Sequence, residues 1–116
     1  MPLLKLSLSV KLDEDTKTSL LQNLSKTLAE GLGKPENYVM VAIDDGVAIS
    51  MSGEIGPAAF ADVRSIGALD AKINKAFSKK LCTLLNEQCE IPPDRIYINY
   101  TDIDASYWGW NNSTFG

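Results

Sequence analysis

The first ten residues alternate between apolar and polar side chains. Every second position from Leu4 to Val10 is leucine or valine, and a lysine and two serines lie between them. A period of two is typical of a β-strand that buries only one of its faces. We therefore predict a strand over residues 2–10 with one side on a core.

The next apolar residues recur at the spacing of a helix. Leucines repeat every three or four residues from Leu21 to Leu32, which is typical of an amphipathic helix. Asp13 suits the position before the first turn, where its carboxylate can accept a backbone N–H. Gly33 ends the helix, and Pro35 prevents its return.

A second segment repeats this arrangement. Asp70 can cap a helix whose apolar face runs from Ile73 to Cys89, and Pro92-Pro93 stops it. The two halves of the chain therefore resemble each other.

Further apolar segments indicate strands. Residues 37–43 are apolar at the positions of both faces, which predicts a central strand. Asp45-Gly46 is a turn signal, so residues 47–51 are expected to form a short hairpin strand after it. Residues 58–66 and 95–101 complete the predicted strands.

The order strand–helix–strand occurs twice, which favours an α+β fold. Two such units most simply form a four-stranded sheet with both helices on one face, because parallel crossovers are right-handed. The length of 116 residues fits a single domain, residues 1–116. The other sheet face then lacks cover and suits either contact with further copies of the chain or an ordinary half-exposed sheet. Side chains expected on it are Leu3, Tyr38, Met40, Tyr97 and Asn99.

Composition excludes several kinds of chemistry. The chain has no histidine, and histidine is the commonest general base and metal ligand. We expect no metal and no cofactor. With 15 acidic and 11 basic residues, a net charge of −4 and no basic run, the chain is a poor binder of nucleic acid. Cys82 and Cys89 would lie about 10 Å apart on one helix, too far for a disulfide.

The chain shows no secretion or membrane signal. Its first residues lack a basic segment and an apolar run, and no stretch approaches the roughly 20 apolar residues of a membrane span. We expect a cytoplasmic protein that does not bind membranes. Export without a signal peptide stays open.

Met1-Pro2 is the sharpest candidate for chemistry. Initiator methionine is commonly removed before proline, which would leave a secondary amine at the terminus. Burial disfavours the protonated amine and lowers its pKa, so that it can act as a base near neutral pH. Many proteins begin with Met-Pro, so the dipeptide alone is a weak signal.

Six longer motifs add a family resemblance. They are PLL after Met1, GKP at Gly33–Pro35, SIG at Ser65–Gly67, KLC at Lys80–Cys82, PDRIYINYTD at Pro93–Asp102 and GWNNSTF at Gly109–Phe115. The block from Pro93 to Phe115 is long and specific. Together these motifs resemble the macrophage migration inhibitory factor (MIF) family of the tautomerase superfamily from end to end.

The resemblance implies a fold, an assembly and an activity. Members of this family have two β-α-β repeats and form homotrimers with sites between neighbouring subunits. They catalyse keto–enol tautomerisation of phenylpyruvate-like aromatic keto acids and isomerisation of dopachrome. Vertebrate members also act as cytokines, so one alternative is a MIF-like interaction protein with an unidentified receptor. A plain structural trimer is the third hypothesis.

Carried over by position, the resemblance makes Pro2 the catalytic base. It assigns the substrate carboxylate to Lys34 and to the backbone amide of Ile66. Tyr97 and Asn99 match site residues of the adjacent subunit. Trp110 and Phe115 match aromatic positions of the pocket wall. Without the resemblance, each of these residues also has a structural explanation, such as a lysine that complements a helix dipole.

The chain departs from the family pattern at several positions. Trp108 replaces a small aliphatic pocket residue and follows the bulky Tyr107, so we expect a narrower substrate pocket that still suits phenylpyruvate better than dopachrome. In residues 57–61, alanines occupy the positions of a Cys-x-x-Cys pair, which removes thiol–disulfide exchange. Arg64 and Arg95 are too far apart in sequence for the arginine pair of related dehalogenases and decarboxylases.

Overall fold

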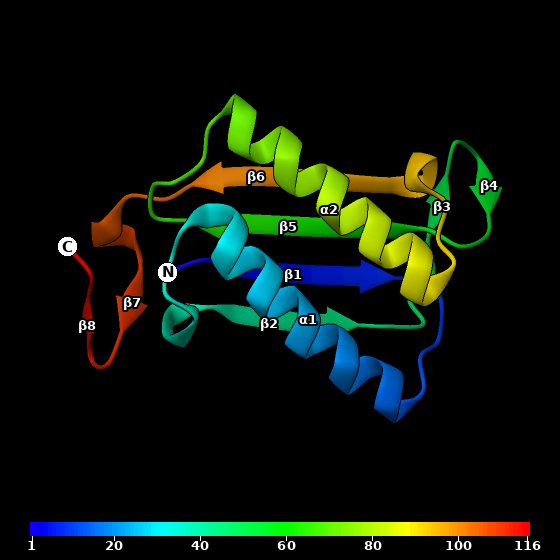
Figure 1. The fold of residues 1–116 in the computed structure, drawn as a ribbon, viewed down its shortest axis with the longest axis horizontal. Coiled ribbons are helices and arrows are strands. Elements are labelled where there is room, and N and C mark those ends of the chain that lie inside the picture. Colours follow the sequence, from blue (N-terminus) through cyan, green and yellow to red (C-terminus); the bar gives the residue numbers. More distant parts are fainter.

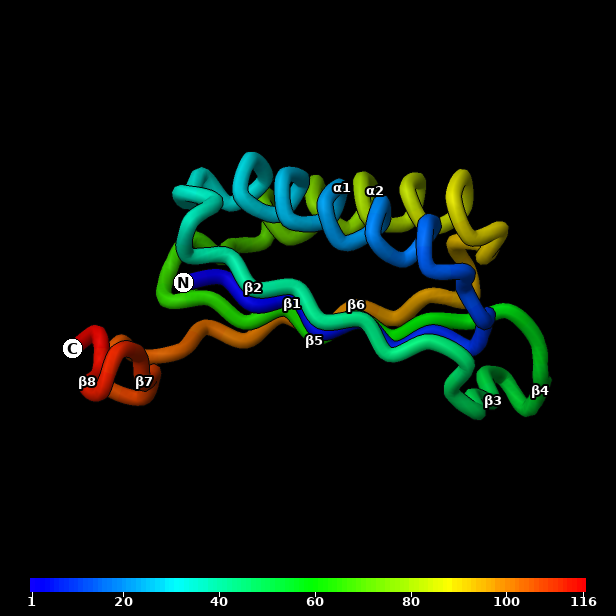
Figure 2. The backbone as a smooth tube through the Cα atoms, turned by 90° about the horizontal axis from the view of Figure 1, so that it is seen from below, coloured from blue at the N-terminus to red at the C-terminus, as the bar shows by residue number.

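The sheet and its helices form two layers. In the computed structural model, which describes residues 1–116, both helices lie on one face of a four-stranded sheet (Figures 1 and 2). This arrangement confirms the predicted α+β fold. The sheet consists of β1 (Leu3–Leu8), β2 (Met40–Asp44), β5 (Ala59–Ser65) and β6 (Ile96–Asp102), and the helices are α1 (Glu14–Leu32) and α2 (Ala71–Cys89). Two small hairpins pair β3 (Ser50–Met51) with β4 (Glu54–Ile55) and β7 (Gly109–Trp110) with β8 (Ser113–Thr114).

Helix α1 begins and ends where the sequence predicts. The Asp13 carboxylate accepts the backbone N–H of Thr16 at 2.7 Å, which satisfies one of the free donors of the first turn. Gly33 follows the last turn with φ of 63°. Glycine adopts this left-handed conformation without the steric cost of a Cβ.

Helix α2 begins as predicted and ends earlier than its prolines require. The Asp70 carboxylate accepts the backbone N–H of Ile73 at 2.8 Å. The helix ends at Cys89, and Glu90 takes a left-handed conformation with φ of 56°. Pro92-Pro93 therefore prevents the helix from continuing, whereas Glu90 is the residue that turns the chain.

The strand order is β2-β1-β5-β6, with β1 and β5 antiparallel in the middle. The second strand of each repeat runs parallel to the first and lies at an edge. The prediction that residues 37–43 form a central strand is therefore wrong. The apolar residues of this strand lie on both faces of the sheet. Val41 packs against the core, whereas Met40 is 65% exposed on the uncovered face.

The prediction that Asp45-Gly46 forms the hairpin turn is wrong, although the short hairpin strand expected in residues 47–51 is present as β3. The hairpin turn is Ser52-Gly53, where both residues have positive φ, as a two-residue turn matching the strand twist requires. The Asp45 carboxylate has another role, because it accepts the backbone N–H of Leu12 at 2.8 Å and pairs with Lys17 at 3.2 Å. These contacts fasten the start of α1 to the end of β2.

The core lies between the helices and one sheet face. The alternating leucines of β1 are fully buried there, which confirms the prediction for the first strand. Phe77 of α2 is also buried, and Gly31 of α1 lets it approach closely, since a Cβ on Gly31 would lie 3.1 Å from the Phe77 ring. Cys82 and Cys89 are free thiols, as their spacing predicts, and burial raises the pKa of both.

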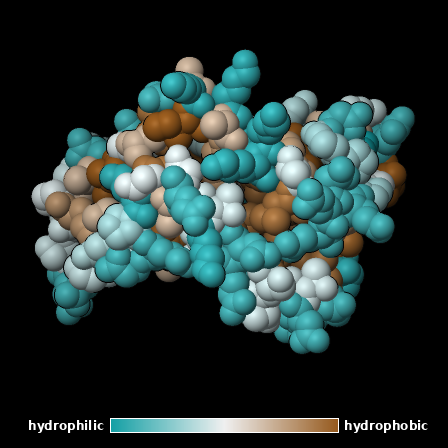
Figure 3. Space-filling model, in the orientation of Figure 1, coloured by the Kyte–Doolittle hydropathy of each residue, from teal (hydrophilic) through white to brown (hydrophobic).

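The other sheet face has no cover from this chain (Figure 2). Tyr97 is 67% exposed and Phe60 42% exposed on it, so the predicted uncovered and partly apolar face is present. On the opposite side, hydrophilic side chains predominate over the helices (Figure 3). The strand register arranges the uncovered face in three rows, Met40–Leu3–Arg64–Thr101, Ala42–Lys5–Asp62–Asn99 and Asp44–Ser7–Phe60–Tyr97.

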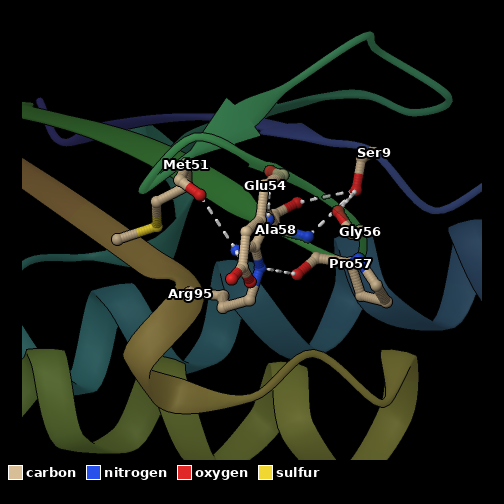
Figure 4. A network of polar contacts seen from close by, with 7 residues as sticks. All are labelled: Ser9, Met51, Glu54, Gly56, Pro57, Ala58 and Arg95. Atoms are coloured by element: carbon tan, nitrogen blue, oxygen red, sulfur yellow. Dashed lines mark hydrogen bonds and ion pairs between the residues drawn. The ribbon is translucent and has the colours of Figure 1, made fainter.

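A single arginine holds the β3–β4 hairpin to the end of the sheet (Figure 4). The Arg95 guanidinium donates to the carbonyls of Pro57 at 2.8 Å, Met51 at 3.1 Å and Glu54 at 3.0 Å. Its side chain is only 15% exposed. A guanidinium has five N–H donors in a rigid fork, so one side chain satisfies three carbonyls of the same loop.

Ser9 fastens the chain between this hairpin and β5 (Figure 4). Its hydroxyl oxygen accepts the backbone N–H of Ala58 at 2.9 Å and lies 3.0 Å from the carbonyl of Gly56, to which it donates. The loop is therefore held by the residue after β1 and by the residue before β6.

We expect Arg95→Met to detach the hairpin. Losing three charge-assisted bonds should lower the free energy of unfolding by about 2–3 kcal/mol and accelerate amide hydrogen exchange in residues 50–57. Arg95→Lys should recover only part of the loss, because an ammonium lacks the fork. Lys75→Met, at an exposed position of α2, is the matched control. Unchanged exchange in Arg95→Met would show that the hairpin is held by other contacts.

Candidate functional site

A cavity of about 510 Å³ opens where the start of β1 meets the C-terminal segment. Its volume falls in the range of small-molecule sites, which are typically 300–1,000 Å³ and mostly apolar. The wall is predominantly hydrophobic and comes from four parts of the chain that lie far apart in sequence. The lining residues are 1–3, 37–40, 64, 103, 107–110 and 115.

Pro2 lies in this wall and is fully buried. Its carbonyl accepts the backbone N–H of Met40 at 3.0 Å, which extends the pairing of β1 with β2 to the end of the chain. Because β1 is a central strand, neighbours on both sides shield Pro2 from water. The predicted burial of the chain start is therefore correct.

The terminal amine, here on Met1, lies in the same wall. Burial lowers its pKa below the usual range, and the positive charge of Lys34 lowers the pKa further. Both effects favour the neutral amine, which is the form that accepts a proton.

Lys34 follows the C-terminal cap of α1 and stands beside the N-terminus. Its backbone N–H donates to the carbonyl of Ala29 at 3.0 Å, which fixes the turn out of the helix. The residue is half-buried but does not line the cavity in this chain. Its positive charge lowers the pKa of the terminal amine, so the end of α1 influences the protonation of the group at the start of β1.

Three aromatic rings form one side of the cavity. Trp110 and Phe115 stack with their centroids 5.4 Å apart and their planes at 8°. The Tyr38 ring meets both edge-on, at 5.7 Å from Trp110 and 6.1 Å from Phe115. Offset and edge-to-face contacts of this kind stabilise aromatic clusters, so the wall is held in place before any ligand binds.

Trp108 also lines the cavity and is half-buried. The Phe115 N–H donates to the Trp108 carbonyl at 3.1 Å, so the same residue fastens the tail. The volume of about 510 Å³ is that of the cavity with the indole in its wall, beside Trp110 and Phe115.

Ile66, Tyr97 and Asn99 are not brought to this cavity. Tyr97 shares a row with Ser7, four residues along β1 from Leu3, a separation of about 13 Å at 3.3 Å per residue. Asn99 lies one row nearer. One chain therefore does not bring Tyr97 and Pro2 together.

The structure adds lining residues that the sequence did not assign to the site, among them Tyr38, Arg64 and Ile103. Tyr107, the bulky neighbour of Trp108, also lines the cavity. Tyr38 was expected on the sheet face but lies in a short 3₁₀ turn, Glu36–Tyr38. For Arg64 the only sequence signal was its alternate position with Asp62, which places both on one strand face.

No three potential metal-ligand side chains come together in the chain. Neither helix combines the length and apolar character needed to cross a membrane.

Comparison with known proteins places this arrangement in a family. The family model for macrophage migration inhibitory factor (MIF) matches residues 1–116. The chain is 43% identical to macrophage migration inhibitory factor of Meriones unguiculatus over 83% of this chain and 84% of that protein. It is 38% identical to that of Xenopus laevis over 99% of both.

Solved structures agree with the sequence match. The chain is similar to the crystal structure of a macrophage migration inhibitory factor homologue from Prochlorococcus marinus, with a TM-score of 0.94 and 46% identity. The similarity covers 98% of this chain and 99% of that one. The chain therefore belongs to the macrophage migration inhibitory factor family, within the tautomerase superfamily.

Proposed function

We propose that this chain is a keto–enol tautomerase of phenylpyruvate-type acids, with Pro2, freed of Met1, as the general base. Membership of the family supports an isomerase activity in general. One observation carries the finer proposal: the chain terminus lies buried in an aromatic cavity, where burial and the Lys34 charge lower the pKa of the terminal amine.

Removal of Met1 would move the amine one residue inward. Pro2 is fully buried whereas Met1 is half-buried, so we expect desolvation to act on the Pro2 amine as well. The Met40 N–H holds the Pro2 carbonyl, and this bond involves no atom of the amine. The backbone therefore stays in place when the terminus changes.

The chemistry is a proton transfer between carbon and oxygen. The neutral Pro2 nitrogen takes a proton from C3 of the keto acid, and the electron pair of the C–H bond moves to form the C2–C3 double bond of the enolate. The enolate oxygen then receives the proton from the Pro2 ammonium, which regenerates the base. Lys34 would hold the carboxylate by charge, and the aromatic wall would pack against the aryl group.

The proposal includes a homotrimer that completes the site. Tyr97 and Asn99 lie on the uncovered sheet face, away from the cavity of their own chain, and this face exposes several large apolar side chains. Packing the faces of three copies against one another would bury those side chains. It would also allow Tyr97 and Asn99 of one copy to reach the cavity of the next, where Tyr97 would donate to the developing enolate oxygen.

A second candidate function is that of a MIF-like interaction protein. The relatives from Meriones unguiculatus and Xenopus laevis carry the name macrophage migration inhibitory factor. On this proposal the cavity is retained but its turnover is incidental, and binding of the purified assembly to a receptor is the relevant test.

Removing the base or the carboxylate partner should reduce turnover in different ways. Following phenylpyruvate by ultraviolet absorbance, Pro2→Gly should lower kcat by about 100-fold, in the range of a lost general base. Lys34→Ala should lower kcat/KM by about 10-fold or more through a lost charge-assisted bond. Intact mass must show that Met1 is absent from each preparation. A full rate in Pro2→Gly would remove Pro2 from the mechanism.

The pH dependence of kcat/KM should change when the positive charge of Lys34 is removed. The base acts when deprotonated, so kcat/KM should rise as pH rises through the pKa of the amine. Lys34 lowers that pKa, as it does for the amine of Met1, so Lys34→Ala should move the rising limb to higher pH. Lys72→Ala on the exposed face of α2 should leave the limb in place. A shift to lower pH in Lys34→Ala would contradict this electrostatic assignment.

The assembly is tested by mass in solution. Light scattering should give three times the 12.6 kDa of the chain. Phe60→Asp should give monomers, because it places a carboxylate on the face that the copies cover. Ala76→Asp, on the exposed face of α2, is the control and should stay trimeric. A monomeric wild type would exclude the shared site.

A further inference from the structure

The cavity contains one charged side chain, that of Arg64. The other lining side chains are aromatic, aliphatic or uncharged, and ten of the 14 lining residues are hydrophobic. Half of the Arg64 side chain is exposed, so it stays solvated, but a guanidinium beside apolar walls attracts an anionic group more strongly than one in open water. An anionic partner, either in the protein or in a ligand, is therefore favoured at this position.

The protein satisfies only part of the Arg64 guanidinium. Its Nε and Nη2 donate to a single carboxylate oxygen of Asp62, at 3.2 Å and 3.0 Å. Two of the five N–H groups are used, and three remain. Asp62 lies two residues back on the same face of β5, so it fixes the direction of the guanidinium while leaving donors for another acceptor.

Arg64 lines the cavity beside the chain start. In the strand register it lies opposite Leu3, the residue after Pro2, and its side chain is 51% exposed. Its row is the one nearest the cavity and farthest from Phe60 and Tyr97, so a ligand in the cavity can reach the guanidinium at this end of the face that the copies would cover.

Arg64 and Lys34 occupy different places around the site. Lys34 follows α1, on the helix side of the sheet, and its charge acts on the terminal amine. Arg64 lies on the uncovered face of β5, and its charge is not among the causes that lower the pKa of that amine. A single carboxylate beside the amine thus leaves Arg64 free, whereas a ligand with two separated anionic groups engages both cations.

We propose that Arg64 selects ligands with a second anionic group, remote from the 2-keto acid carboxylate, such as an aromatic keto acid with a carboxylate on its ring. This inference rests on the proposed function, because it takes Lys34 as the partner of the first carboxylate. A planar carboxylate matches the remaining fork of the guanidinium. The aromatic wall of Tyr38, Trp110 and Phe115 then packs against the ring between the two charges.

Ligand binding tests the inference without turnover. Cinnamate and 4-carboxycinnamate differ by one ring carboxylate, and quenching of Trp108 and Trp110 fluorescence reports their binding. Wild type should bind the dicarboxylate about 10-fold more tightly than cinnamate, and Arg64→Gln should abolish this preference. Arg64→Lys should retain part of it. Lys72→Gln removes an equal charge from the exposed face of α2 and should keep the full preference.

Turnover tests the same selectivity in the reaction. The ratio of kcat/KM for 4-carboxyphenylpyruvate to that for phenylpyruvate should fall about 10-fold in Arg64→Gln. Thermal unfolding and solution mass of this variant should match the wild type, which shows that the assembly is intact. If wild type turns over neither acid yet keeps the Arg64-dependent binding preference, the tautomerase proposal fails and the anion selectivity stands.

Two results would overturn the inference. The first is equal affinity of the wild type for cinnamate and 4-carboxycinnamate, because Arg64 then meets no ligand group. The second is an equal loss of affinity for both ligands in Arg64→Gln, because Arg64 would then hold the first carboxylate.

Discussion

The antiparallel pairing of β1 with β5 is the contact on which the rest of the structure depends. It joins the two repeats through their first strands and so places the start of the chain in the middle of the sheet. β2 closes the other side through the bond from the Met40 N–H to the Pro2 carbonyl. A terminus at an edge strand would be solvated, and its amine would keep an ordinary pKa. Central placement is what makes the terminal amine a candidate base.

The second constraint is the placement of charge around an apolar cavity. Lys34 acts on the amine from the end of α1, while Arg64 lines the cavity from β5 with its guanidinium hydrogen-bonded to Asp62. The aromatic cluster of Tyr38, Trp110 and Phe115 forms one wall of the cavity on the tail side. Cations near low-dielectric walls attract anions more strongly than cations in water, so the site as a whole favours anionic aromatic molecules.

The central-strand prediction and the turn prediction are wrong for different physical reasons. The apolar residues on both faces of residues 37–43 predict a central strand, but an edge strand of a sheet with one uncovered face shows the same pattern. Asp45-Gly46 has the composition of a hairpin turn, yet the Asp45 side chain bonds to Leu12 and Lys17, which lie far away in sequence. Local composition does not distinguish a residue that turns the chain from one that accepts a remote donor.

The sequence alone determined the local features and the family. Periodicity and capping residues located both helices and all four sheet strands, because these signals act between residues a few positions apart. The motifs identified Pro2, Trp110 and Phe115 as site residues, and Trp108 stood out as a departure at a pocket position; the structure places all four in the cavity wall. Only the tertiary structure decided that Tyr38 and Arg64 join them and that Tyr97 lies about 13 Å along the sheet from Leu3. Strand order and register are long-range pairings, and no local pattern in the chain encodes which rows of side chains they bring together.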